Sequence, residues 1–205
     1  MKVSGSLNLT KQQGGNMKKT LETVEGDAGL PSDMSHSNLL EHAVIKADRP
    51  PIDFDVYIAG PFFNDVQIET MNKAIEMMED HGLKVFDPRK HGPVLGNMDP
   101  QERKKHTKAV LDANFYGVTR SYMTIACIDD RDTGTAWELG LGYGLGIPQI
   151  TFSGRGFGAN VMIAESVGGH MPTLDALDTF LDIFSDAIIK REVDLSMLTK
   201  ADTID

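Results

Sequence analysis

Two carboxylates in the stretch DDRDTGTAWELGLGYGLGIP, residues 129–148, are spaced so that they could act together. Asp132 lies in a polar turn, and Glu138 follows six residues later in an apolar, glycine-rich segment. Two carboxyl groups at close range are what glycosyl transfer with retention of configuration requires, because one attacks the sugar while the other assists the leaving group. The positive end of a helix favours an ionised carboxylate, so Glu138 is the candidate nucleophile.

Each carboxylate also has a purely structural interpretation. Thr135 and Glu138 fit the S/T-x-x-E capping box, in which the glutamate accepts a hydrogen bond from the backbone N–H of the threonine. Asp132 fits an ordinary turn aspartate next to a helix. The residues alone leave these interpretations open beside the catalytic one.

The rest of the chain predicts the elements that would position this pair. Short apolar runs indicate strands, and segments with helical spacing of apolar residues lie between them. This alternation predicts an α/β fold, with a parallel sheet covered by helices on both faces and ligands bound where the strands end. The expected strands are 56–60, 83–88, 122–129 and 148–153, the expected helices are 65–81, 100–120, 135–145 and 174–190, and the loops that meet at the ligand-binding edge are AGPFFND, DPRKHG, DDRDTG and SGRGFGAN.

Composition divides the chain and excludes several classes of protein. We expect a flexible N-terminal extension at 1–50, in which 37–46 could form a short helix, then a catalytic domain at 51–192 and a C-terminal tail at 193–205. No run is long and apolar enough for a membrane span or a secretory signal, and a single cysteine suits a reducing cytoplasm. The net charge of −10 disfavours nucleic-acid polymers and anionic membranes, so a small uncharged ligand is expected.

Common cofactor and metal motifs do not fit. The glycines at 140–146 lack the G-x-G-x-x-G spacing and lie inside an expected helix, no P-loop pattern occurs, and no residues have zinc-ligand spacing. Cys127 lies in an expected buried strand, which favours a core residue over a nucleophile. The basic cluster at 103–108 favours the solvated face of a helix. Neither a cofactor nor a metal is expected.

Three motifs, taken in order, resemble the nucleoside 2-deoxyribosyltransferase family: VYIAGPFF at 56–63, DDRDTGTAWELG at 129–140 and NVMIAES at 160–166. The resemblance extends over about residues 55–189. It implies a flavodoxin-like, doubly wound sheet of five parallel strands with helices on both faces. It also implies an enzyme without a cofactor that moves a 2-deoxyribosyl group from a 2′-deoxynucleoside to a free nucleobase through a covalent glycosyl-enzyme.

The resemblance assigns roles to residues that match the family motifs. Glu138 matches the nucleophile that attacks the anomeric carbon, and Tyr57 matches a tyrosine hydrogen-bonded near it. Asp132 matches the aspartate that contacts the base and helps to protonate it. Phe62 and Phe63 match the aromatic wall against which the base packs.

Further residues of the motifs would bind substrate. Gly60 and Gly134 belong to the matched loops. Asn160 and Met162 match a pair that reaches from a neighbouring subunit toward the sugar 5′-hydroxyl, so a homo-oligomer is implied. Asn114 stands where some family members have an aspartate, and because an amide has no titratable proton, the acid role would pass to Asp132 or water.

Two other functions stay open beside the transferase. One is an N-glycoside hydrolase that acts on deoxynucleosides or their 5′-monophosphates. A phosphate would need serine, arginine and backbone donors near the first loop, and AGPFFND has neither residue, although Arg89 and Arg155 could bind a phosphate. The other is a non-catalytic nucleotide-sensing module, since a fold does not fix a function.

Overall fold

The computed structural model describes residues 49–93 and 98–200. The predicted helix at 37–46 and nearly all of the predicted N-terminal extension lie outside the described residues, and the domain boundaries stay a prediction. The elements are β1 (Phe54–Ala59), α3 (Asp65–Asp80), β2 (Val85–Phe86), α4 (Pro88–His91), α5 (Pro100–Arg120), β3 (Ser121–Cys127), the 3-10 helix η1 (Asp129–Arg131), α6 (Thr133–Gly144), β4 (Gln149–Phe152), α7 (Val161–Ser166), β5 (Gly169–Met171) and α8 (Leu174–Lys190).

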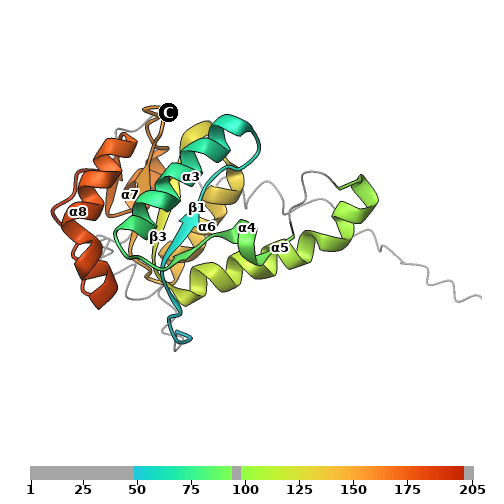
Figure 1. The fold of residues 1–205 in the computed structure, drawn as a ribbon, viewed down its shortest axis with the longest axis horizontal. Helices are drawn as coiled ribbons and strands as arrows, with labels where there is room; N and C mark the ends of the chain where they lie inside the picture. The colour runs from blue at the N-terminus through green and yellow to red at the C-terminus, as the bar shows by residue number, and fades with distance from the viewer. Residues whose placement is uncertain (1–48, 94–97, 201–205) are drawn as a thin grey trace, which may run out of the picture. The chain divides into compact units, whose positions relative to one another are not determined.

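The five strands form one parallel sheet in the order β2-β1-β3-β4-β5 (Figure 1). In its register, Tyr57 of β1 pairs with Thr124 of β3, and Ile125 of β3 pairs with Ile150 of β4. This is the strand order of flavodoxin-like folds. The predicted α/β fold with a five-stranded parallel sheet is confirmed.

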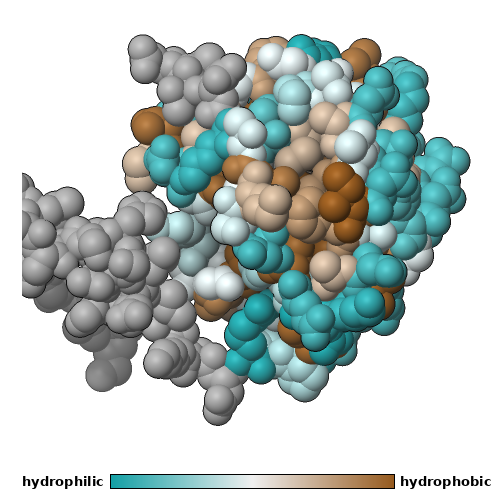
Figure 2. Space-filling view, turned by 90° about the vertical axis from the view of Figure 1, so that its left-hand side faces the viewer, coloured by the Kyte–Doolittle hydropathy of each residue, from teal (hydrophilic) through white to brown (hydrophobic). Residues whose placement is uncertain are grey.

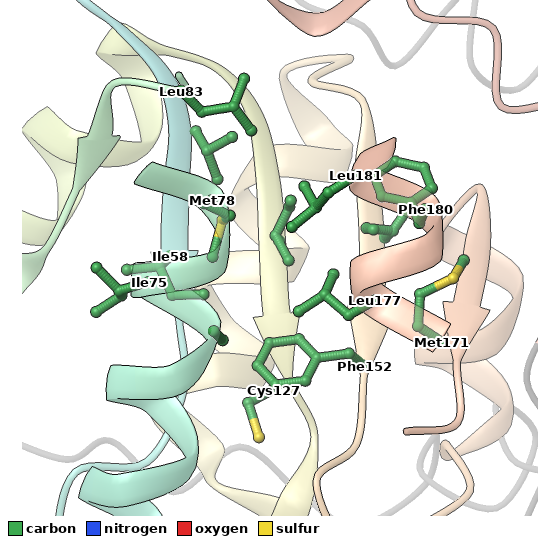
Figure 3. Packing of buried hydrophobic residues seen from close by; sticks show 14 of the residues in the cluster. Ile58, Ile75, Met78, Leu83, Cys127, Phe152, Met171, Leu177, Phe180 and Leu181 are labelled. Atoms are coloured by element: carbon green, nitrogen blue, oxygen red, sulfur yellow. The ribbon is translucent and has the colours of Figure 1, made fainter. Parts of the chain in front are cut away.

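Helices cover both faces of the sheet, and each face has its own hydrophobic core. Because successive strand residues point to opposite faces, Ile58 packs with α3 and α8, whereas Tyr57 packs with α5 and α6. Figure 3 shows the first core, in which Met78 of α3 and Leu177 of α8 close over the strands. Burial of these side chains supplies the main stabilisation of the domain.

The chain order places a crevice at the carboxyl ends of β1 and β3. After β1, α3 leads outward to β2, and α5 then returns across the other face to β3 on the opposite side of β1. The connection after β1 leads toward β2, and the connection after β3 leads through α6 to β4 on the other side, so the two loops leave this edge in opposite directions. Ligands bind at such a switch point. The loops after β1, β2 and β3 all open there.

Several short elements differ from the sequence-based expectations. The helices at 100–120 and 174–190 have their predicted bounds, but the loop DPRKHG contains α4, and β2 has only two residues. The elements α7 and β5 had no predicted range. Both are short and lack a long apolar run, so their formation depends on packing against the rest of the sheet.

Gly117 allows α5 to approach the sheet closely. A Cβ at this position would overlap the Phe86 ring and come within 2.7 Å of Tyr57 Cδ2. The absence of a side chain therefore brings the last turns of α5 directly over β1 and β2.

The residues after α8 lie along the outer strand β5. The backbone N–H of His170 donates to the carbonyl oxygen of Thr199 at 2.9 Å, and Leu195 and Leu198 pack near Gly168 and Gly169.

Figure 2 shows a largely hydrophilic face with one area where hydrophobic residues gather. Across residues 49–93 and 98–200, no helix has the length and apolar character needed to cross a bilayer.

Candidate active site

Glu138 is buried at the crevice and is held by residues from two other elements. Its side chain projects from α6, and the residue is only 6% exposed. The Tyr57 hydroxyl of β1 donates to Glu138 Oε1 at 2.7 Å, and Asn114 Nδ2 of α5 donates to the same oxygen at 2.8 Å. Within the described ranges, no donor bonds to the other oxygen, Oε2. The carboxylate is thus fixed through one oxygen.

Burial dominates the electrostatics of this group. Loss of solvation raises the pKa of Glu138 to about 7, the negative charge of Asp132 adds to the rise, and the hydrogen bonds from Tyr57 and Asn114 oppose it. Burial, and then the charge of Glu138, raises the pKa of Tyr57 well above its ordinary value. Tyr57 therefore stays protonated and remains a donor to Glu138.

The sequence predicts that the positive end of the helix keeps Glu138 ionised, but in the structure burial has the larger effect on its pKa. Because α6 begins at Thr133, Glu138 is its sixth residue and lies beyond the first turn, where the field of a helix terminus has weakened. Burial therefore outweighs the helix dipole. At neutral pH the protonated and ionised forms of Glu138 are both populated.

The predicted capping box is also wrong, because a different residue caps the helix. Asp132 is the N-cap, and its Oδ2 accepts hydrogen bonds from the backbone N–H and from Oγ1 of Thr135, both at 2.8 Å. Glu138 bonds to Tyr57 and Asn114 and so is not part of a capping box with Thr135. The structural interpretation of Asp132 as a helix-proximal turn residue is correct, and the same carboxylate also borders the crevice.

A cavity of about 380 Å³ opens at this point. Its volume lies in the range of small-molecule sites. Tyr57 is fully buried and does not line the cavity, but its hydroxyl donates to Glu138, which does. The cavity is lined by Gly60, Phe62, Phe63, Pro88, Arg89, Gly92, Pro93, Val110, Asn114, Asp132, Gly134 and Glu138.

Seven of the ten residues expected for the transferase site line this cavity, and Tyr57, Asn160 and Met162 do not. Asn160 caps α7, its Oδ1 accepting from the backbone N–H of Met162 at 2.9 Å. Met162 is 76% exposed. Neither residue lines the cavity of its own chain.

Five lining residues were not expected as part of the transferase site. Val110 lies one helical turn before Asn114, on the same side of α5. Pro88, Arg89, Gly92 and Pro93 follow β2, whose carboxyl end was expected at this edge of the sheet. Pro88, Arg89 and Gly92 belong to the loop DPRKHG and Pro93 follows it directly, so the expected position of this loop is the available signal. From the sequence, Arg89 is expected only as a possible phosphate ligand.

Residues set aside in the sequence have structural positions. Cys127 is buried in the first core, and burial raises the pKa of its thiol to about 12, which makes it inert. The lysines and arginine at 103–108 lie exposed on α5, as expected for a solvated helix face. In the described part of the chain, no three His, Cys, Asp or Glu side chains are grouped so that they could hold a metal ion.

Comparisons with known proteins identify the family. A solved structure of 2-deoxyribosyltransferase from Bacillus psychrosaccharolyticus is 32% identical to the chain, covers 62% of it and 94% of its own length, and has a TM-score of 0.49. A conserved protein from Enterococcus faecalis is 18% identical, covers 66% of this chain and 97% of its own, and has a TM-score of 0.44. No curated protein matches the chain. The family model described as nucleoside 2-deoxyribosyltransferase matches residues 56–167, more than half of the sequence, and the chain therefore belongs to that family.

Proposed function

We propose that the protein transfers a 2-deoxyribosyl group between nucleobases, with Glu138 as the nucleophile. The observation that carries this proposal is the arrangement around Glu138. Two neutral donors hold Oε1, and no described donor occupies Oε2, in a carboxylate that lines a cavity of nucleoside size. An oriented, partly desolvated carboxylate with one unoccupied oxygen suits attack on a sugar carbon.

The reaction has two displacements. Oε2 of ionised Glu138 forms a bond to the anomeric carbon while the N-glycosidic bond breaks and its electron pair passes to the departing base. The departing base takes up one proton, which reaches it from water directly or by way of Asp132. A second base then attacks the anomeric carbon, releases the Glu138 carboxylate and loses its proton, so configuration is retained overall.

Charge at the site supports free nucleosides over 5′-monophosphates. Among the described residues of the lining, Arg89 is the one Lys or Arg, and it is paired with Asp87. Arg155 does not line the cavity and is paired with Asp129 and Asp130. A phosphate dianion entering beside Glu138 would meet cations that are already neutralised, whereas an uncharged nucleoside would meet no such penalty.

The experiment that tests this function combines turnover with trapping of the intermediate. The protein is incubated with deoxyinosine or thymidine, with and without excess adenine, and free base and new nucleoside are separated by chromatography. We expect deoxyadenosine from the native protein and none from Glu138→Ala. Acid-quenched protein should carry one deoxyribosyl group on Glu138 by mass spectrometry. Glu69→Ala, which removes an exposed glutamate of α3, is the matched control.

Other outcomes lead to the alternative functions. Free base without deoxyadenosine would make the protein a hydrolase, and deoxynucleoside 5′-monophosphates would be tested next. Ligand binding that leaves every nucleoside intact would contradict catalysis and support a nucleotide-sensing module.

We also propose that Asn160 and Met162 complete the site of a neighbouring subunit. Met162, Val161 and Trp137 are exposed hydrophobic side chains, which a subunit interface would bury. If the site is shared, Glu138→Ala and Asn160→Ala chains, each inactive alone, should regain up to about a quarter of native activity when refolded together, because one mixed pairing restores both residues. A monomer by light scattering, or no recovery in the mixture, would contradict the proposal.

A further inference from the structure

Arg89 is fixed at the wall of the cavity by three side chains. Its Nε and Nη2 donate to Oδ1 and Oδ2 of Asp87 at 3.0 and 2.8 Å, and its Nη1 donates to Asn72 Oδ1 at 2.9 Å. The guanidinium carbon lies 4.4 Å from the centroid of the Phe62 ring. An arginine bound by a carboxylate, an amide and an aromatic ring has little rotational freedom, so its plane is set before any ligand arrives.

The remaining donors of Arg89 define what it can recognise. A guanidinium has five N–H groups, and the three bonds to Asp87 and Asn72 use three of them. Among the residues that the structure describes, no acceptor engages the other two, one on each terminal nitrogen. Arg89 is 28% exposed as a side chain and lines the cavity, so it offers a ligand two donors in one plane and no acceptor.

The surrounding charges select a neutral acceptor. The side chain of Asp87 is only 2% exposed, so its charge acts on Arg89 with little screening by water. Asp132 and Glu138 add further carboxylates to the lining. An anion gains little from an arginine in this setting, whereas a carbonyl oxygen and a ring nitrogen are uncharged acceptors that a guanidinium can bind together.

We propose that Arg89 selects the nucleobase, favouring 6-oxopurines, such as hypoxanthine and guanine, over adenine. The 6-oxopurine edge presents O6 and N7 side by side, which is the pattern that an arginine binds with two hydrogen bonds. Adenine presents an amino group in place of O6, so one donor of Arg89 would face another donor. The Phe62 ring beneath the guanidinium extends the same wall and offers a surface for the base. This inference rests on the proposed function, since it names the base that the same cavity accepts.

Binding of free bases tests the selection without requiring turnover. Dissociation constants of hypoxanthine and adenine are measured by titration calorimetry at pH 7.5 for the native protein, Arg89→Met and Arg89→Lys. We expect hypoxanthine to bind roughly 10- to 100-fold more tightly than adenine to the native protein. In Arg89→Met this ratio should fall to about one, because both donors are lost. Arg89→Lys keeps a charge beside Asp87 but loses the planar pair of donors, so its ratio should fall as well.

The matched control is Lys90→Met. Lys90 is the next residue of α4, its ammonium group pairs with Glu79, and it does not line the cavity, so the ratio should stay at the native value. Equal affinity for the two bases in the native protein, or a native ratio in both folded Arg89 variants, would overturn the inference. Selective binding without any deoxyribosyl transfer would refute the proposed function alone, and transfer without base selection would refute the role of Arg89 alone.

Discussion

Asp129 and Glu138 are both buried carboxylates at the carboxyl edge of the sheet, and their surroundings differ. Asp129, just after β3, accepts hydrogen bonds from Ser153 Oγ and from the backbone N–H of Gly154, and Arg155 Nε lies 3.6 Å from its Oδ2. Glu138 receives only two neutral donors, both on Oε1, and no cation pairs with it in the described part of the chain. Charge is compensated around Asp129 and left uncompensated around Glu138.

The difference shows how the hydrogen-bond donors and cations around a buried carboxylate distinguish a group that stabilises the fold from one that is available for a reaction. A carboxylate with donors on both oxygens and a nearby cation stabilises the fold around it. Asp129 does so beside Asp130 and Arg131, whose backbones adopt the left-handed region at φ 63° and 52°, a conformation that costs free energy in residues other than glycine. Glu138 instead keeps one oxygen without a described donor, and its burial with no paired cation among the described residues raises its pKa.

The largest expected effect comes from neutralising Glu138 without removing it. Glu138→Gln keeps the size of the side chain and an oxygen for Tyr57 and Asn114, but an amide cannot form the glycosyl ester. Transfer of deoxyribose should fall on the order of 10⁴-fold or more, measured as new nucleoside per minute. Retention of a tenth of the native rate would mean that another group is the nucleophile.

The pH dependence of catalysis should follow the ionisation of Glu138. Because its pKa is about 7 and the nucleophile is the ionised form, kcat/KM should fall about tenfold per unit below pH 7. At pH 5 the rate would be roughly 100-fold below its plateau. Initial rates between pH 5 and pH 9 measure this, and a flat profile down to pH 5 would contradict the raised pKa.

Removal of the hydrogen bond from Tyr57 should lower the rate and shift the same pH profile. Tyr57→Phe deletes the hydrogen bond to Glu138 Oε1 and leaves the ring in the core. We expect kcat to fall roughly 10- to 100-fold, as for loss of a hydrogen bond to a charged group. Since this bond lowers the pKa of Glu138, the acidic limb should also move to higher pH. Tyr116→Phe, on the exposed side of α5, is the control and should leave the limb unmoved.

The smallest expected effect is on stability, with opposite signs at the two carboxylates. The pKa of Glu138 rises from 4.5 to about 7 on folding, so the native state binds more protons between these values and stability falls as pH rises through 7. Glu138→Gln should therefore raise the free energy of unfolding by about 1–3 kcal/mol at pH 8 and change it little at pH 4. Asp129→Asn should lower the free energy of unfolding by about 1–3 kcal/mol at pH 8, because it replaces one of the two oxygens that accept from Ser153 and Gly154 with an amide donor. Urea unfolding at both pH values measures the changes, and a loss in both variants would contradict the contrast.

Most of the architecture could be predicted from apolar periodicity. The helices at 100–120 and 174–190 are long enough for periodicity and end signals to fix both ends, whereas β2 and β5 have too few residues for any pattern. The sequence predicts a start at Thr135 for α6, where Thr135 and Glu138 satisfy a capping pattern, whereas the structure has Asp132 as the cap three residues earlier. Local patterns do not show which of two competing caps wins.

Many residues of the candidate site could be predicted from the sequence, but the pKa of Glu138 and the contacts of Arg89 could not. Glu138, Asp132 and Phe62 were expected from motifs, and the sheet topology explains why their loops converge. The raised pKa of Glu138 depends on how deeply packing buries it, which no spacing reports. The clamp on Arg89 joins α3 and α4, so it forms only after these helices dock.

Gly117 has a consequence for anyone who wishes to redesign this protein. Asn114 lies three residues before it on α5, and it reaches Glu138 because the helix can rest against Tyr57 and Phe86. Position 117 does not itself line the cavity, yet a single methyl group added there would lift the helix and lengthen the Asn114 bond. A mutant library aimed at new substrates should therefore vary the walls formed by Phe63, Pro93 and Val110 and keep position 117 as glycine.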